Sequence, residues 1–228
     1  MKNISTKKKI VVVAVALCLV AILSMGTLAW FTASDKVVND FYFGTTEEDG
    51  DELFAIDVWE DNDDDGVTDK DYDGLQFDHV LPNQILYKEP HLENKGQYSQ
   101  FVRATVIIEE ASVLASHFEG EWSDPANMLK GINTTDWTIG PAKFVKGGED
   151  RIEYMFYYNH VLLSGESTTE IFKQVQLPWA LTVEDALALD EHFTVTIYGE
   201  AIQSEHLEYE GNAITDAERA FSLLVDGN

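Results

Sequence analysis

Short stretches in which apolar and polar residues alternate recur along this chain of 228 residues. A period of two places the apolar side chains of a stretch on one face, as in a half-buried β-strand. The clearest case runs from Phe193 to Ala201, and Phe101 to Ile108 follows the same rule. Arg151 to Tyr158 is apolar and aromatic on both faces, which predicts a strand in the interior of a sheet.

Weaker alternation predicts further strands between turn residues. They are expected at Leu53 to Trp59, Leu75 to Leu81, Ile85 to Leu92 and Ile171 to Leu177, with a ragged strand pair around Gly140-Pro141 within Trp137 to Val145.

Helix signals occur only in connections. Asp124 as N-cap and Pro125 at the first helical position predict a short helix from Ser123 to Leu129. Thr182 opens another that continues through Leu189, and a capping box at Thr215 to Glu218 opens a short C-terminal helix. Short strands joined by turns and short helices predict an all-β fold, an antiparallel β-sandwich.

The N-terminus has the pattern of an export signal. Three lysines precede an unbroken apolar run of 14 residues, Ile10 to Leu23, which is shorter than the roughly 20 residues of a membrane span. Thr27 and Ala29 then place small side chains three and one positions before Trp30, as a signal peptidase requires. We therefore predict that residues 1–29 are a signal peptide cut between Ala29 and Trp30.

Charge and cysteine content narrow the possible partners. The chain has 41 acidic and 15 basic residues and a formal net charge of −26, and the signal removes four of the lysines. Such a field repels nucleic acid and anionic lipid, so we expect no nucleic-acid partner and membrane contact only through the uncleaved signal. The single cysteine, Cys18, leaves with the signal, so the mature chain has no disulfide. We expect one domain over residues 45–228, preceded by a mature N-terminal segment at 30–44.

Several short motifs resemble one known family. Gly26 to Thr32 gives a small-residue cut site followed by aromatics, and Asn39 to Gly44 gives a short apolar segment ending in glycine. Leu92 to Gly96 and Phe101 to Val106 are similar to its "E-N-x-G … Y-V-R" stretch. Further matches are Tyr157 to Leu162 with Gly165 to Thr169 and Phe172 ("Y-Y-N-K-V-L … P-G-E-S-T … L-F"), and Glu200 to Gln203 ("E-A-I-Q"). Together they resemble the SipW-dependent exported proteins, the TasA and camelysin family of Gram-positive bacteria.

The resemblance carries its own expectations. It implies a jelly-roll-like sandwich, cleavage by a signal peptidase of the SipW type, and secretion to the extracellular matrix or cell surface. For TasA-type members it implies a biofilm-matrix subunit that associates with itself and with other matrix proteins. The acidic stretch at 57–73 departs from the family pattern, and Trp30-Phe31 is bulkier than the usual start.

The acidic stretch contains a candidate calcium loop. Asp61, Asp63, Asp65 and Asp69 stand at positions 1, 3, 5 and 9 of such a loop, and Gly66 stands at position 6. Tyr72 occupies position 12, where a glutamate is usual, so Asp73 would have to replace it. The alternative is an acidic loop surrounded by solvent.

The sequence contains few motifs that indicate a catalytic site. None of the six histidines has a second histidine four residues away, so the chain lacks the H-E-x-x-H zinc motif. It also lacks a mature cysteine and a G-x-S-x-G segment. We therefore predict no enzyme, although the resemblance to camelysin-type proteins implies a metallopeptidase as a distant alternative. The aromatic run Tyr154 to Tyr158 fits an interior strand better than a carbohydrate platform.

Two functions remain, and they differ in the use of the N-terminal segment. A fibre subunit would donate this segment as a strand to the open edge of a neighbour, whereas a monomeric calcium-dependent module for a glycan or protein ligand would keep it in its own sheet. The segment is unusually apolar for a free end. Its candidate assembly residues are Trp30, Phe31, Val37, Val38, Phe41 and Phe43.

Overall fold

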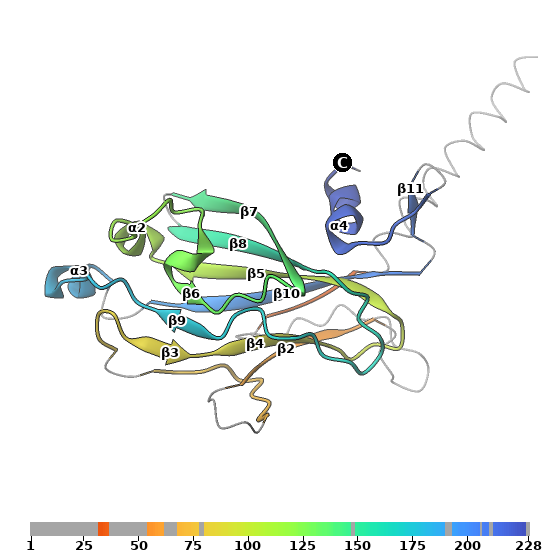
Figure 1. Cartoon of the computed structure of the whole chain (residues 1–228), viewed down its shortest axis with the longest axis horizontal. Coiled ribbons are helices and arrows are strands. Elements are labelled where there is room, and N and C mark those ends of the chain that lie inside the picture. The colour runs from red at the N-terminus through yellow and green to blue at the C-terminus, as the bar shows by residue number, and fades with distance from the viewer. Residues whose placement is uncertain are drawn as a thin grey trace, which may run out of the picture.

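Two antiparallel layers of strands lie face to face in the computed structural model of the chain (Figure 1). The structure describes residues 32–36, 54–61, 68–77, 80–146, 149–189, 193–205, 207–209 and 212–226. The first layer is a five-stranded sheet in the order β1-β10-β5-β8-β7. Its strands are β1 (Thr32–Lys36), β10 (Val195–Gln203), β5 (Gln100–Glu109), β8 (Arg151–Tyr158) and β7 (Trp137–Val145).

The second layer combines two smaller sheets. One pairs β2 (Ile56–Asp61) with β4 (Glu89–Asn94), and the other has the order β3 (Ile85–Tyr87), β9 (Gln174–Gln176) and β6 (Leu129–Lys130). Backbone hydrogen bonds continue the pairing between them, because the segment leading into β9 donates along β4 from Thr168 N to Leu92 O at 2.8 Å and from Ile171 N to Pro90 O at 3.0 Å. The two sheets therefore act as one layer.

The chain crosses repeatedly between the layers. Consecutive strands change layer from β4 to β5, β5 to β6, β6 to β7, β8 to β9 and β9 to β10, and β1 lies beside β10. Such alternation, with strands from the two ends of the chain side by side, is typical of a jelly roll. The predicted all-β, antiparallel, jelly-roll-like sandwich with short connecting helices is confirmed.

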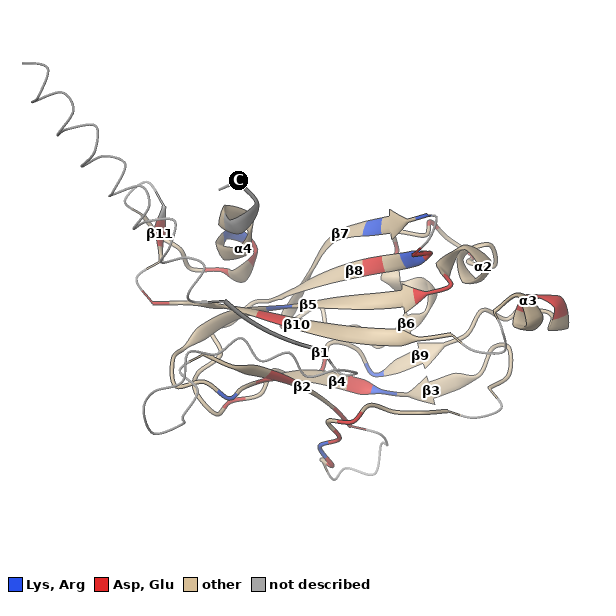
Figure 2. Ribbon diagram, turned by 180° about the vertical axis from the view of Figure 1, so that it is seen from behind, with Lys and Arg blue, Asp and Glu red and all other residues tan. Residues whose placement is uncertain are grey.

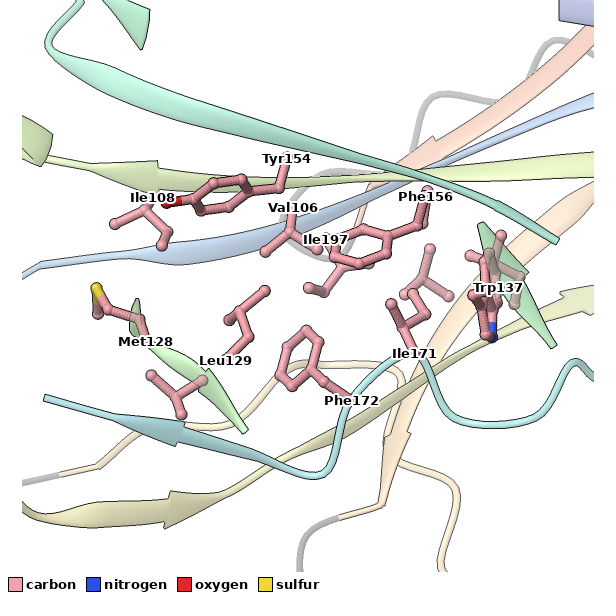
Figure 3. Packing of buried hydrophobic residues seen from close by; sticks show 14 of the residues in the cluster. Val106, Ile108, Met128, Leu129, Trp137, Tyr154, Phe156, Ile171, Phe172 and Ile197 are labelled. Carbon is pink, nitrogen blue, oxygen red and sulfur yellow. The ribbon is translucent and has the colours of Figure 1, made fainter. Parts of the chain in front are cut away.

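The main core fills the space between the layers (Figure 3). On β5, Val102, Ala104, Val106 and Ile108 face inward and are fully buried, as the alternation predicted. β8 lies between β5 and β7 and contributes large inward side chains, which explains its apolar character. Each large aliphatic or aromatic side chain buried here stabilises the fold by about 1.5 to 3 kcal/mol. Charged residues lie largely at strand ends and in connections (Figure 2).

A second, smaller cluster lies on the opposite face of the first sheet. The C-terminal helix α4 (Ala217–Asp226) buries Phe221 against Phe101, Tyr157 and Ile202. Arg103 lies at its margin, 4.4 Å from the Phe221 ring centroid. Its Nε and Nη2 donate to the two carboxylate oxygens of Glu200 at 2.6 and 3.0 Å. The predicted terminal helix is confirmed, and the outer face of the sheet is partly covered by it.

The other helices are short. The predicted helix after Thr182 is α3 (Val183–Ala188), with a complete capping box between Thr182 and Asp185. The predicted helix at 123–129 is only the single turn η1 (Pro125–Asn127), capped by Asp124 as expected. A five-residue helix, α2 (Ala111–Ala115), and the small hairpin of β11 (Glu208–Tyr209) and β12 (Asn212–Ala213) were not predicted.

Three strand predictions need correction. The single strand predicted at 85–92 is divided into β3 and the first part of β4, which belong to different small sheets. The described parts of 75–81 form no strand, and Phe77 and Leu81 are exposed. The alternation that Leu75 and Phe77 begin ends at His79, where a polar residue takes the apolar position. Residues 137–145 form the one strand β7 instead of a pair, with the register irregularity between Ile139 and Ala142 absorbing the Gly-Pro.

Candidate functional site

The described parts of the acidic stretch, 57–61 and 68–73, pair with each other, and we call the stretch the acidic hairpin after this pairing. β2 ends at Asp61 and the chain returns at Asp71, where Glu60 and Asp71 exchange two backbone hydrogen bonds of 2.8 and 3.0 Å. Residues 68–73 project from the β2–β4 side of the sandwich (Figures 1 and 2). Asp63 and Asp65 lie outside the described residues.

A buried ion pair lies beneath the hairpin base. Glu60 is 0% exposed and Lys88 7%, and Lys88 Nζ donates to Glu60 Oε1. Within the described residues, the second oxygen of Glu60, Oε2, is buried without a hydrogen-bond partner. Removing two charges from water is costly, so each depends on the other for compensation.

Asp61 is the best-placed residue of the calcium motif. It is only 8% exposed, and its Oδ1 is buried without a hydrogen-bond partner among the residues that the structure describes. Glu89 lies opposite it in the β2–β4 register. An unpaired buried carboxylate oxygen is destabilising unless something compensates it, and a cation is one such compensation.

The remaining aspartates of the motif lie elsewhere. Asp69 and Asp73 are exposed, and the Asp73 backbone N donates to Asp71 Oδ1 at 2.8 Å. Over the described ranges, no three histidine, cysteine, aspartate or glutamate side chains gather closely enough to hold a metal ion. The calcium loop therefore stays a prediction, with its first residue in a suitable environment.

The returning arm of the hairpin is clamped onto the outer face of β2 and β4. Lys70 Nζ lies 5.0 Å from the Trp59 ring centroid and donates to Glu93 at 2.9 Å. Glu93 also accepts from Tyr72 Oη at 2.7 Å and pairs with Lys95 at 2.9 Å. Glu93 thus holds the arm on β4, and Lys70 covers Trp59 of β2. The sequence analysis missed this network.

Four titratable groups in and beside this clamp have shifted pKa values: those of Tyr72 and Lys95 are raised, and those of Glu93 and His91 are lowered. Burial raises the pKa of Glu93, but hydrogen bonds from Tyr72, Lys70 and Lys95 outweigh it, so the pKa lies below its ordinary value of 4.5. Burial lowers the pKa of His91, whose ring is stacked on Trp59 at 4.0 Å, below its ordinary 6.5, although a hydrogen bond to Thr168 O opposes the shift. The folded clamp therefore favours ionised Glu93 and neutral His91.

Asn94 joins the motif segments on which the family resemblance rests. It is 0% exposed, and its Nδ2 donates to Tyr98 O at 2.8 Å and Leu162 O at 3.0 Å. Its Oδ1 accepts from Gly96 N at 2.9 Å and from Gln100 Nε2 at 2.8 Å. Two donors and two acceptor positions are all that an amide has, so this side chain is fully satisfied.

Backbone contacts extend the same junction. Asn94 N donates to Glu166 O and Gly165 N to Asn94 O, both at 2.9 Å. In the first sheet Glu200 to Gln203 lies in register with Arg103 to Gln100. The "E-N-x-G", "G-E-S-T" and "E-A-I-Q" segments, which are far apart in sequence, thus lie around one end of β5.

The edge of the first sheet is formed by β1. Its five residues pair with β10, from Thr32 opposite Ile202 to Lys36 opposite Tyr198, and β1 ends the strand order. The candidate assembly residues Trp30, Phe31, Val37, Val38, Phe41 and Phe43, and the cleavage residue Ala29 with the rest of the signal segment, lie outside the described residues. The stretch between the assembly residues is paired within its own chain.

The fold and these features define an all-β protein of two antiparallel layers, with an acidic hairpin on one layer and a terminal strand at the edge of the other. No family model, curated protein or solved structure matches the chain. None of the helices that the structure describes has both the length and the apolar character needed to span a membrane.

Proposed function

We propose that this protein is a secreted structural subunit of an extracellular matrix or cell-surface fibre, and that it assembles by donating its N-terminal strand. The observation that supports this most is the position of β1, a five-residue edge strand held by antiparallel pairing with β10. Main-chain hydrogen bonds are the same whichever chain supplies the strand, so β1 of one subunit can replace β1 of the next. Exchange of this kind is head to tail and does not close, which gives a fibre.

The motif residues support the same proposal. The "E-A-I-Q" segment lies within β10 and is the partner of β1, since Ala201 stands opposite Ala33. The apolar residues on either side of β1 in the sequence would give a donated strand additional side chains to bury. The formal net charge of −26 makes subunits repel, so assembly should strengthen with salt, low pH or calcium.

A disulfide across the exchange site tests the proposal directly. Ala33 and Ala201 are register partners, and antiparallel partners have Cα separations of about 4.5 to 5.5 Å, within the range of a disulfide. Since the mature chain would hold no other cysteine, the variant Ala33→Cys/Ala201→Cys can form only this bond. Lys36→Cys/Tyr198→Cys is a second pair in the same register, should the first disturb folding.

The order of oxidation and assembly decides the outcome. Oxidation before assembly should trap β1 in its own sheet and give monomers that a reductant releases for elongation. Oxidation after assembly should link neighbours and give a covalent ladder on a denaturing gel. Monomer-only bonds in assembled fibres would show that β1 does not exchange.

Truncation and N-terminal sequencing complete the test. Deleting residues 30–38 should leave a folded monomer that cannot elongate, and electron microscopy with and without calcium reports both states. The secreted protein should begin at Trp30. Fibres from the truncated protein, or a full-length mature protein that stays monomeric at high salt, low pH and with calcium, would favour the monomeric binding module instead.

We propose calcium binding by the acidic hairpin as a second function, favoured by the unpaired buried Oδ1 of Asp61. Oxygen ligands from Asp61, Asp63, Asp65, Asp69 and Asp73 suit this hard cation. A hundredfold excess of calcium over the dissociation constant should stabilise the metal-stripped protein by about 2.7 kcal/mol. Changing Asp61 and Asp65 to Ala should abolish that gain, with magnesium as the control ion. An unchanged melting temperature in millimolar calcium would argue for a solvated loop.

A further inference from the structure

A hollow of about 230 Å³ lies at one end of the second layer, away from the acidic hairpin. Its walls come from the turn before β3, the end of β9, η1 and the residues that follow α2. Pockets for drug-sized ligands span about 300 to 1,000 Å³ and are mainly apolar. This hollow is smaller and has many polar residues in its wall, which favours a small polar ligand or one ring of a larger chain.

An exposed tryptophan stands at its rim. Trp179 is 66% exposed, while Trp137 is buried in the core, Trp59 is buried beneath Lys70 and His91, and Trp122 is partly buried. Trp179 is therefore the only exposed tryptophan of the described part of the chain. The preceding Pro178 is buried, and its ring fixes the backbone from which the indole emerges. A large flat apolar face held in water at a rim is suited to stacking against a ligand.

Two side-chain amides lie together in the wall. Gln176 Nε2 donates to Asn83 Oδ1 at 3.0 Å, which holds the two amides edge to edge. The structure gives Asn83 Nδ2 and Gln176 Oε1 no hydrogen-bond partner among the described residues. A donor and an acceptor are therefore available side by side, a pattern that matches the neighbouring hydroxyls of a sugar.

The backbone holds Asn83 in place before any ligand arrives. Its φ of 63° is in the left-handed region, which Asn tolerates better than most residues. The turn is closed by Gln84 N donating to Leu81 O at 3.0 Å and by Leu81 N donating to Gln84 Oε1 at 2.8 Å. A site whose groups are already ordered loses less entropy on binding.

The opposite wall is rigid as well. Asn127 Nδ2 donates to Glu121 O at 2.7 Å and to Asp124 O at 2.9 Å, and its Oδ1 accepts from Gly120 N at 3.3 Å. These bonds occupy Asn127 within its own loop. Lys130 in the wall donates to Ala126 O and Asn127 O, and His117 pairs with Asp185. Among the described residues of the wall, the polar groups left for a ligand are therefore the amide groups of Asn83 and Gln176 and the exposed carboxylate of Glu119.

We propose that this hollow is a carbohydrate-binding site that takes one neutral sugar ring of a glycan. Trp179 would stack against the C–H face of the ring, while Asn83 Nδ2 and Gln176 Oε1 would bond two hydroxyls. Among sugars, a neutral ring is favoured over an acidic one, because the chain carries a formal net charge of −26 and repels anions. The site does not depend on strand donation, and it would attach a monomer or a fibre to a glycan equally well.

Three variants of the secreted protein separate the site from its surroundings. Trp179→Ala removes the stacking face. Asn83→Gly removes the amide but keeps a residue that adopts positive φ, so the turn should survive. Tyr98→Ala is the control, because Tyr98 is another exposed aromatic, 41% exposed, that does not line the hollow.

Binding is measured on a glycan array and then by calorimetric titration with glucose, galactose, mannose, N-acetylglucosamine and the oligomers of any that bind. We expect at least one neutral saccharide to bind, and Trp179→Ala and Asn83→Gly to weaken it about tenfold or more, equivalent to about 1.4 kcal/mol, with Tyr98→Ala unchanged. Thermal melts confirm that each variant is folded. Absence of saccharide binding on the array and in titrations at millimolar concentration, or equal binding by Trp179→Ala, would overturn the proposal.

Discussion

Replacing the buried Asn94 with Ala should be among the most destabilising single substitutions in this protein. The substitution removes four hydrogen bonds from a side chain that is fully buried. At about 0.5 to 1.5 kcal/mol each, their loss amounts to about 2 to 6 kcal/mol. Asn94→Asp keeps the shape but replaces the amide donors with a second acceptor, so the carbonyls of Tyr98 and Leu162 would face an oxygen. We expect it to be at least as destabilising.

Urea unfolding at neutral pH gives the free energy of unfolding for each variant. Asn159→Ala is the matched control, because Asn159 also bonds a backbone carbonyl and a side chain but is exposed, and it should lose about 1 kcal/mol or less. A central loss of about 4 kcal/mol for Asn94→Ala corresponds to a melting temperature roughly 8 to 16 °C lower. If Asn94→Ala costs no more than the control, water replaces the amide and Asn94 does not hold the junction together.

Three further predictions concern charged groups. Lys88→Met should lower the free energy of unfolding by about 3 to 5 kcal/mol, because it leaves Glu60 unpaired in the interior. The double variant Lys88→Met/Glu60→Leu should restore most of the lost stability. Urea unfolding of the two single variants and the double variant measures this as a double-mutant cycle. Both His91 and Glu93 have pKa values below their ordinary ones in the folded state. The stability that they contribute is therefore present above about pH 6.5 for His91 and pH 4.5 for Glu93, and it is lost as the pH falls through the folded pKa of each group. Urea unfolding across the pH range and NMR titration check this, and a His91 pKa above 6.5 would contradict it. Arg103→Lys should lose about 1 to 2 kcal/mol in thermal melts, since lysine cannot keep the two-pronged carboxylate contact, and an unchanged melting temperature would show that this contact is unimportant.

The sequence predicted strands best where one face meets the core. Phe101 to Ile108 became β5 with its apolar face fully buried, and Phe193 to Ala201 became the main part of β10. Leu75 to Leu81 begins with a similar pattern, but the pattern ends at His79, and Phe77 and Leu81 are exposed, so its described parts form no strand. Alternation indicates which face of a segment is apolar. A strand also needs a neighbouring strand to pair with, and the topology of the whole chain determines whether one is available.

The candidate site was harder to predict for the same reason. The aspartate spacing indicated a calcium loop, but it did not indicate that Asp61 would be buried or that Glu60 would pair with Lys88. Trp59 gave the only available signal of the clamp, because an aromatic on the polar face of a strand needs a cover. That cover comes from Lys70 and His91, which reach Trp59 through a hairpin and through strand register, and neither contact is visible in local sequence.

The pairing of β1 with β10 also determines when β1 can join its sheet during folding. Thr32 meets Ile202, so the first strand must wait for one of the last segments of the chain before it has an edge to join. Contacts between such distant residues pay the largest loop-closure cost and form late in folding. Until β1 has paired, the β10 edges of neighbouring chains are equally unoccupied. Pairing of β1 with its own β10 depends on its effective concentration within the chain, and pairing with another chain's β10 depends on the protein concentration. If β1 exchanges between chains as proposed, crowding among newly folding chains would favour pairing between molecules, and dilution would favour closure within one.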